Sequence, residues 1–172
     1  MIERFHFFLI SLFGLGKISR FPGSLGSLAT CLLFYLIVTF IPTFFITFKF
    51  ALFIVLIILF FVSLYSIERY TRFSHHKDQR EIIIDEFFGQ LIPLIFFYYY
   101  IFSSFADKFP LVMKFDFYII LSFFVFRFFD IVKPFPIGWI DKKINNSLGV
   151  MFDDLVAGLF TAILLLLPSF LF

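Results

Sequence analysis

FRFFDIVKPFPIGWIDKKINNSLGVMFDD, residues 126–154, is the segment that decides how this sequence is interpreted. It joins two strongly apolar stretches, yet it contains the charged residues Arg127, Asp130, Lys133, Asp141, Asp153 and Asp154. Charges at the edge of a hydrocarbon layer cost free energy unless they are paired or bind an ion. The segment therefore indicates a binding or catalytic site. The alternative is an ordinary solvated loop in which two of the aspartates cap the following helix.

The composition indicates an integral membrane protein. Of the 172 residues, 62% are hydrophobic and only 15% are charged, whereas soluble domains have about 25% charged residues. The mean hydropathy is +1.04. The length suits one compact domain over residues 1–172. Cys31 has no partner for an intrachain disulfide, so we expect a packed thiol.

The apolar stretches predict an all-α, polytopic membrane bundle of about five transmembrane helices. The predicted spans cover residues 27–45, 50–67, 82–100, 115–131 and 153–172. Residues 5–13 are apolar but shorter than the roughly 20 residues that a spanning helix needs. No cleavage site follows them, so we expect an interfacial or re-entrant N-terminal segment.

The basic residues predict the orientation. They divide 11 against 3 between the two sides of the predicted bundle, and the richer side is cytoplasmic by the positive-inside rule. The amino terminus is then inside and the carboxyl terminus outside. The same cytoplasmic side receives the acidic residues Asp85, Glu86, Asp130, Asp141, Asp153 and Asp154.

These carboxylates favour a hard divalent cation. No Cys or multi-His set accompanies them, and His75 and His76 are adjacent, which is poor spacing for zinc. Mg²⁺ prefers oxygen ligands and often bridges to a phosphate. Asp85 and Glu86 stand just inside the apolar boundary that begins at Ile82, where capping alone does not explain them.

Two further features suit phosphate. Arg127 and Lys133, with Arg20 as a third candidate, can bind phosphate oxygens. The segment FPGSLGSLAT, residues 21–30, offers backbone and hydroxyl donors at a helix start, in particular at Ser24, Gly26 and Ser27. Its alternative interpretation is a capped helix with small residues for close packing.

Acids, cations and anion-binding backbone on one face favour phosphoryl chemistry on a lipid head group. Two rival functions stay open. A lipid phosphotransferase uses similar acids but needs a nucleotide-linked donor, and the sequence has no recognisable nucleotide motif. A small ion or proton carrier also uses buried carboxylates, although here the acids gather at one boundary.

The sequence resembles the phosphatidylglycerophosphatase A family of bacterial membrane lipid phosphatases. The resemblance rests on FPGSLGSLAT (21–30), IIIDEFFG (82–89), FRFFDIVKPFPIGWIDKK (126–143) and GVMFDDLVAG (149–158), in this order. Ser24 stands where the family commonly has Thr, and residues 145–147 replace a segment that is often glycine-rich. Neither departure involves an acidic residue.

The resemblance implies a phosphoric monoester hydrolase that converts phosphatidylglycerophosphate to phosphatidylglycerol with Mg²⁺. It implies a phospholipid partner, no nucleic acid, and a multi-pass location in the bacterial inner membrane with the site facing the cytoplasm. The expected metal ligands or general base are Asp85, Glu86, Asp130, Asp153 and Asp154. The expected phosphate-binding residues are Arg127, Lys133, Ser24, Gly26 and Ser27. Asp141 also matches the family, but it can be a loop carboxylate that pairs with a nearby lysine and takes no part in the reaction. The oligomeric state stays open.

Overall fold

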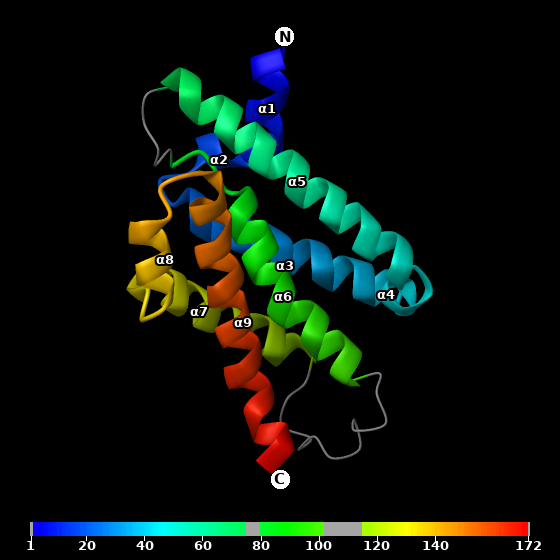
Figure 1. The fold of residues 1–172 in the computed structure, drawn as a ribbon. Coiled ribbons are helices and arrows are strands. Elements are labelled where there is room, and N and C mark those ends of the chain that lie inside the picture. The colour runs from blue at the N-terminus through cyan, green and yellow to red at the C-terminus, as the bar shows by residue number, and fades with distance from the viewer. Residues whose placement is uncertain (1, 75–79, 102–114, 172) are drawn as a thin grey trace.

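The computed structural model describes residues 2–74, 80–101 and 115–171, and these form helices joined by short turns (Figure 1). The helices are α1 (Ile2–Ile10), α2 (Leu15–Ile18), α3 (Pro22–Phe40), α4 (Phe44–Thr47), α5 (Lys49–Ser74), α6 (Ile84–Ile101), α7 (Phe115–Val132), α8 (Ile137–Lys143) and α9 (Ser147–Leu171). The all-α class is confirmed, and no strand occurs in the described ranges.

Several predicted boundaries are wrong. α3 begins at Pro22, because proline suits the first turn of a helix, and it ends at Phe40 before Pro42. α9 begins at Ser147, six residues before the predicted start at Asp153. Between the fourth and fifth predicted spans lies α8, a helix of 7 residues that the sequence analysis did not predict. The polar stretches 75–79 and 102–114, including His75 and His76, lie outside the described residues.

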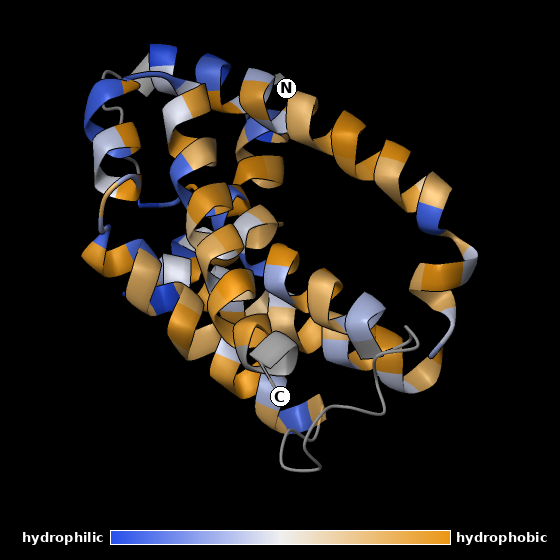
Figure 2. Ribbon diagram, turned by 60° about the horizontal axis from the view of Figure 1, so that its bottom comes forward, coloured by the Kyte–Doolittle hydropathy of each residue, from blue (hydrophilic) through white to orange (hydrophobic). Residues whose placement is uncertain are grey.

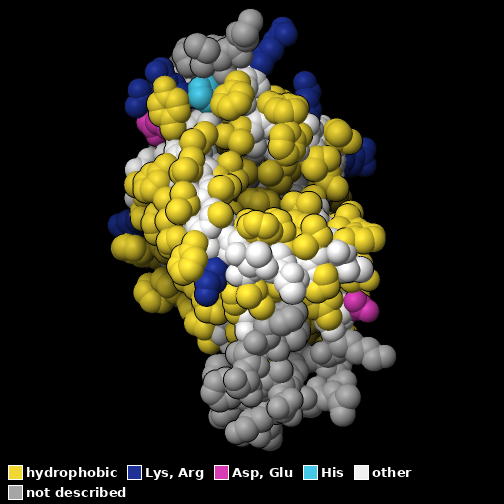
Figure 3. Space-filling model, turned by 90° about the vertical axis from the view of Figure 1, so that its right-hand side faces the viewer, with side chains coloured by type: hydrophobic (Ala, Val, Ile, Leu, Met, Phe, Trp, Pro, Cys, Tyr) yellow, Lys and Arg dark blue, Asp and Glu magenta, His cyan; other side chains and the backbone are white. Residues whose placement is uncertain are grey.

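Three of the described helices are long and apolar enough to cross a membrane by length and composition. They cover Pro22–Phe40, Lys49–Arg72 and Ser147–Leu167. Hydrophobic residues dominate the ribbon in Figure 2, and the hydrophilic residues gather mostly toward one end of it. A large part of the face in Figure 3 is hydrophobic, with most of its basic side chains near the upper edge. The five predicted spans and a re-entrant N-terminal segment are not confirmed.

α6 and α9 form the centre of the bundle, with α3 and α7 packed beside them and the α1–α5 pair to one side (Figure 1). Two glycines allow the central pair to approach closely. A side chain at Gly158 on α9 would meet the backbone carbonyl of Gly89 on α6. Residue 93 is proline, so no N–H at that position can bond this carbonyl within α6. The close crossing places the acids of α6 against those of α9.

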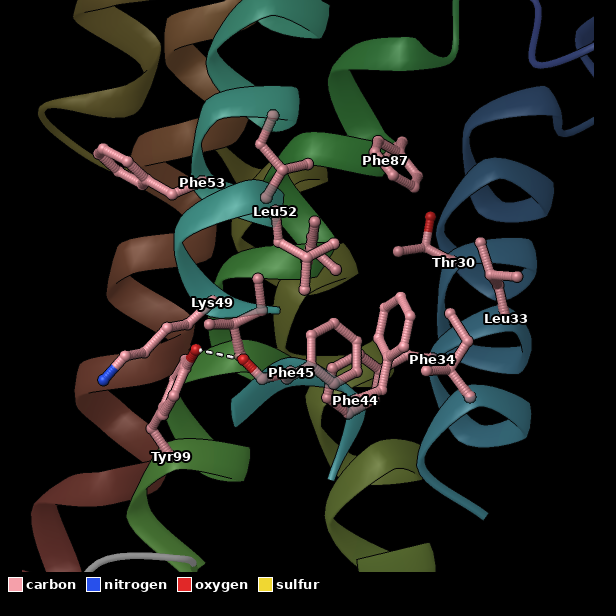
Figure 4. Close-up of a pocket in the computed structure, with 14 residues that line it drawn as sticks. Thr30, Leu33, Phe34, Phe44, Phe45, Lys49, Leu52, Phe53, Phe87 and Tyr99 are labelled. Atoms are coloured by element: carbon pink, nitrogen blue, oxygen red, sulfur yellow. Dashed lines mark hydrogen bonds between the residues drawn. The ribbon is translucent and has the colours of Figure 1, made fainter. Parts of the chain in front are cut away.

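An apolar cavity of about 210 Å³ lies among α3, α4, α5 and α6 (Figure 4). Phe34, Phe45 and Leu52 line it, and the Tyr99 hydroxyl closes one side by donating a hydrogen bond to the Phe45 carbonyl at 2.9 Å. Among the described residues that line it, Lys49 alone is charged. The carboxylates that the sequence analysis selected line a different cavity.

Candidate functional site

The polar site is a cavity of about 530 Å³ at one end of the bundle, which is lined by residues of α3, α6, α7, α8 and α9. The N-termini of α3 and α6, the C-terminal end of α7 and the second turn of α9 all reach it. Its charged lining residues are Arg20, Arg80, Asp85, Glu86, Arg127, Asp130, Lys133, Asp141, Asp153 and Asp154. The structure thus brings together all of the acidic residues that the sequence analysis selected.

Three carboxylates form the innermost part of this site. Asp85, Glu86 and Asp154 each place one oxygen so that all three lie within 4.8 Å of one another. Asp85 Oδ1 and Glu86 Oε2 are buried and have no hydrogen-bond partner among the described residues. Ionised carboxylates at such distances repel one another unless a cation or protons balance them. The oxygen donors, their burial and their free lone pairs fit a hard divalent cation.

Asp153 and Asp154 lie within α9, past its first turn, and are only 4% and 3% exposed. The interpretation of these two aspartates as helix caps is therefore wrong. Their consecutive positions direct them to different partners: Asp154 belongs to the carboxylate trio, whereas Asp153 accepts a hydrogen bond from Lys133.

Arg127 is held between two carboxylates. Its Nη1 is 2.5 Å from Asp130 Oδ2, one helical turn further along α7, and 3.9 Å from Glu86 Oε1 on α6. The Nε group of Arg127 is buried and has no hydrogen-bond partner in the described part of the chain. The guanidinium therefore keeps N–H donors for an anion that enters the cavity.

Lys133 lies one residue beyond α7, with a φ of +46°, so it does not continue the helical face that carries Arg127 and Asp130. Its Nζ is 2.6 Å from Asp153 Oδ2 and 3.0 Å from Asp141 Oδ1. Burial by itself would lower the pKa of Lys133, but the hydrogen bonds and charges of Asp153 and Asp141 raise it above its ordinary value. Asp141, 45% exposed at its side chain, is thus paired with a lysine.

The glycine- and serine-rich start of α3 reaches the site only with its first residues. Gly23 faces Glu86 and Arg127 so closely that a side chain there would collide with the Glu86 carboxylate. Ser24 lines the cavity. Gly26 instead packs against Ile83, and the buried Ser27 donates a hydrogen bond to the Gly23 carbonyl at 3.1 Å. Neither Gly26 nor Ser27 lines the cavity, in contrast to the prediction.

Arg80 is a lining residue that the sequence analysis used only to assign the membrane orientation. It precedes α6 and faces the same cavity as Arg20, which precedes α3. Both residues stand a few positions before a helix N-terminus whose first turn reaches the site. This position in the sequence could have identified both arginines as site residues. The predicted topology puts both helix starts on the same side of the bundle, so residues just before them lie near each other.

The fold and the site together define an apolar helical protein with a buried carboxylate cluster beside arginines, as phosphoryl chemistry at a membrane surface requires. Residues 8–169 match the family model described as phosphatidylglycerophosphatase A. The chain belongs to this family of phosphomonoester hydrolases, and the resemblance noted from the sequence is confirmed.

Two curated relatives carry that same description. The protein of Haemophilus influenzae is 31% identical over 152 residues, which are 88% of this chain and 80% of the relative. The protein of Escherichia coli is 29% identical over 87% of this chain and 75% of the relative. A Bacteroides thetaiotaomicron protein described as a putative phosphatidylinositol-3-phosphatase is 33% identical over 52% of this chain and 48% of its own length. No solved structure matches this chain.

Proposed function

We propose that this chain is a Mg²⁺-dependent phosphatidylglycerophosphatase, which hydrolyses the terminal phosphomonoester of phosphatidylglycerophosphate to phosphatidylglycerol and inorganic phosphate. The observation that carries the proposal is the trio of Asp85, Glu86 and Asp154, which shares one cavity with Arg127 and in which Asp85 and Glu86 each have an unsatisfied buried oxygen. The names of the curated relatives support this substrate.

The trio is the part of the chain that would hold Mg²⁺. When bound, the ion would balance the crowded negative charge and polarise a phosphate oxygen. Gly23, with no side chain, allows the Glu86 carboxylate and Arg127 to lie directly against the start of α3. Arg127 offers its free N–H donors to phosphate oxygens that gain negative charge during the reaction.

The buried Asp153 and the half-buried Asp130 are each held by a cation. Asp130 is fixed by Arg127, and Asp153 is fixed by Lys133. A cation beside a carboxylate favours its ionised form, which can accept a proton from an attacking water. We assign the role of general base to Asp130 and Asp153. Lys133, bound by two carboxylates, acts mainly to position Asp153 and Asp141 rather than to bind phosphate.

We further propose five transmembrane helices, with the site at the cytoplasmic surface of the bacterial inner membrane. α6 and α7 have 18 residues each and supply the two additional spans. The distribution of Lys and Arg supports the orientation. The substrate is a membrane lipid. Because the site lies at the ends of the helices, the head group can reach it while the lipid stays in the bilayer.

The test is phosphate release by the purified protein in neutral detergent, with phosphatidylglycerophosphate as substrate, with and without Mg²⁺. We expect Mg²⁺-dependent release that is lost in Asp154→Ala. Parallel reactions without nucleotide exclude a phosphotransferase if they proceed normally. Absence of phosphate release by folded protein, together with ion flux in liposomes, would contradict the proposal and favour a carrier.

A further inference from the structure

The substrate proposed above has two phosphate groups, and the cations deep in the site are already engaged by carboxylates. Lys133 contacts Asp153 and Asp141, and Arg127 contacts Asp130 and Glu86. Arg127 keeps N–H donors for one phosphate, yet its charge is balanced within the protein. A second phosphate therefore needs positive charge from other residues.

Arg20 and Arg80 provide that charge. Both line the cavity of the site, both are exposed, and neither has an ion pair with any residue in the described ranges. They also line an adjoining cavity of about 500 Å³, whose other charged lining residues are Lys17 and Glu81. The two arginines thus lie where the cavity of the carboxylate cluster adjoins a second cavity, whose lining has more basic than acidic residues.

The surroundings of Arg20 fit a residue that meets a lipid phosphate. Ile18 and Phe21, close to it in the sequence, are 78% and 75% exposed, so two large apolar side chains beside Arg20 lie mostly outside the protein core. Exposed apolar residues next to a cation are typical of a segment at the membrane interface. That level contains the phosphodiester groups of bilayer lipids.

We propose that Arg20 and Arg80 form a second anion subsite, which binds the phosphodiester of the lipid while the terminal phosphomonoester lies among the carboxylates and Arg127. The inference rests on the proposed function and adds to it the residues that select a lipid with two phosphates. Arginine suits this task because its planar fork can bind two phosphate oxygens at once.

Kinetics and product inhibition test the subsite with two probes that each represent half of the substrate. Phosphatidylglycerol contains the phosphodiester alone, and inorganic phosphate represents the released group alone. For Arg20→Ala combined with Arg80→Gln, we expect KM for phosphatidylglycerophosphate and Ki for phosphatidylglycerol to rise about tenfold, as for the loss of charge-assisted hydrogen bonds. Ki for inorganic phosphate should stay unchanged, and kcat should change less than about twofold, because these residues do not touch the reacting group.

Two variants serve as controls. Arg20→Lys keeps the charge and should recover part of the affinity for phosphatidylglycerol. Arg69→Gln removes an arginine that contacts Tyr65 and does not line the cavity, so it should leave all constants unchanged. If it weakens binding equally, general attraction to anionic lipid explains the effect and the subsite is wrong.

Other outcomes are also decisive. A parallel rise of Ki for inorganic phosphate would show that the arginines hold the reacting phosphate, which overturns the subsite but not the phosphatase. An active enzyme with unchanged KM in the double variant would overturn the subsite alone. A folded wild-type protein that releases no phosphate would instead overturn the proposed function on which the subsite depends.

Discussion

Asp85, Glu86 and Asp154 bring three acidic groups into one buried volume, and their mutual repulsion has a measurable consequence. Asp154→Asn removes one charge while keeping the shape of the side chain. In the absence of divalent cations we expect its thermal unfolding temperature to equal or exceed that of the wild type. Phosphatase activity should nevertheless fall about 100-fold or more, because the loss of a supporting group around a metal already costs about 10- to 100-fold.

The effect of Mg²⁺ on thermal unfolding shows whether Asp154 is a ligand of the ion or only repels the neighbouring carboxylates. A ligand that binds only the folded state raises the unfolding temperature, so Mg²⁺ should stabilise the wild type and stabilise Asp154→Asn much less. Asp116→Asn, an exposed acid on α7 outside the site, is the matched control and should respond like the wild type. An equal response of Asp154→Asn to Mg²⁺ would place the cation elsewhere.

Replacing Lys133 should cost more stability than replacing Asp141, because it leaves a buried carboxylate without a cation. Lys133→Met deprives both Asp153 and Asp141 of their cation, and Asp153 is buried. Removing one partner of a buried ion pair costs about 3–5 kcal/mol in typical proteins, whereas an exposed pair contributes about 0–1 kcal/mol. We therefore expect Lys133→Met to destabilise the protein in thermal unfolding and Asp141→Asn to be nearly neutral. Similar losses for both variants would assign the main role to Asp141.

At the scale of elements, the α6–α9 crossing determines the site, because it sets the distance between Asp85 and Asp154. Gly158→Ala places a methyl group against the Gly89 carbonyl, so the helices must separate. Overpacking of this kind costs about 1–3 kcal/mol. We expect a lower unfolding temperature and reduced Mg²⁺ binding, measured by thermal shift in detergent.

Leu159→Ala is the control for the crossing. It changes the adjacent position on α9, whose side chain is 42% exposed on the outside of the bundle, and it should leave Mg²⁺ binding unchanged. If Gly158→Ala binds Mg²⁺ as well as the wild type does, the crossing distance does not control the site.

The sequence predicted the helical elements better than their ends. Apolar length gave the helices, since twenty apolar residues have few alternatives in a bilayer. It missed α8 because a helix of 7 residues is too short for an argument from apolar length. It missed the first turns of α9 because they directly follow the polar residues 145–147, which resemble a loop. The selected acids nonetheless line one cavity, and the cost of unpaired charges near apolar segments marks them wherever the helix begins.

At the scale of the whole molecule, the orientation in the membrane is open to a direct test. Cys31 is buried, so single cysteines introduced into a Cys31→Ala background can be labelled with a membrane-impermeant maleimide. We expect Lys143→Cys to react only in inside-out vesicles and Lys49→Cys only in right-side-out vesicles. Labelling of both from one side would contradict the predicted topology.

The sequence by itself determined the membrane class, the family and the set of acids, because each depends on residue type and order along the chain. Only the tertiary structure decided which acids lie within 4.8 Å of one another and which form ion pairs with Arg127 and Lys133. It also showed that Gly26 and Ser27 do not line the cavity, whereas Arg20 and Arg80 do. The physical reason is that partners in a site are set by helix crossings such as Gly89–Gly158, which join residues about 70 positions apart and leave no local signal in the sequence.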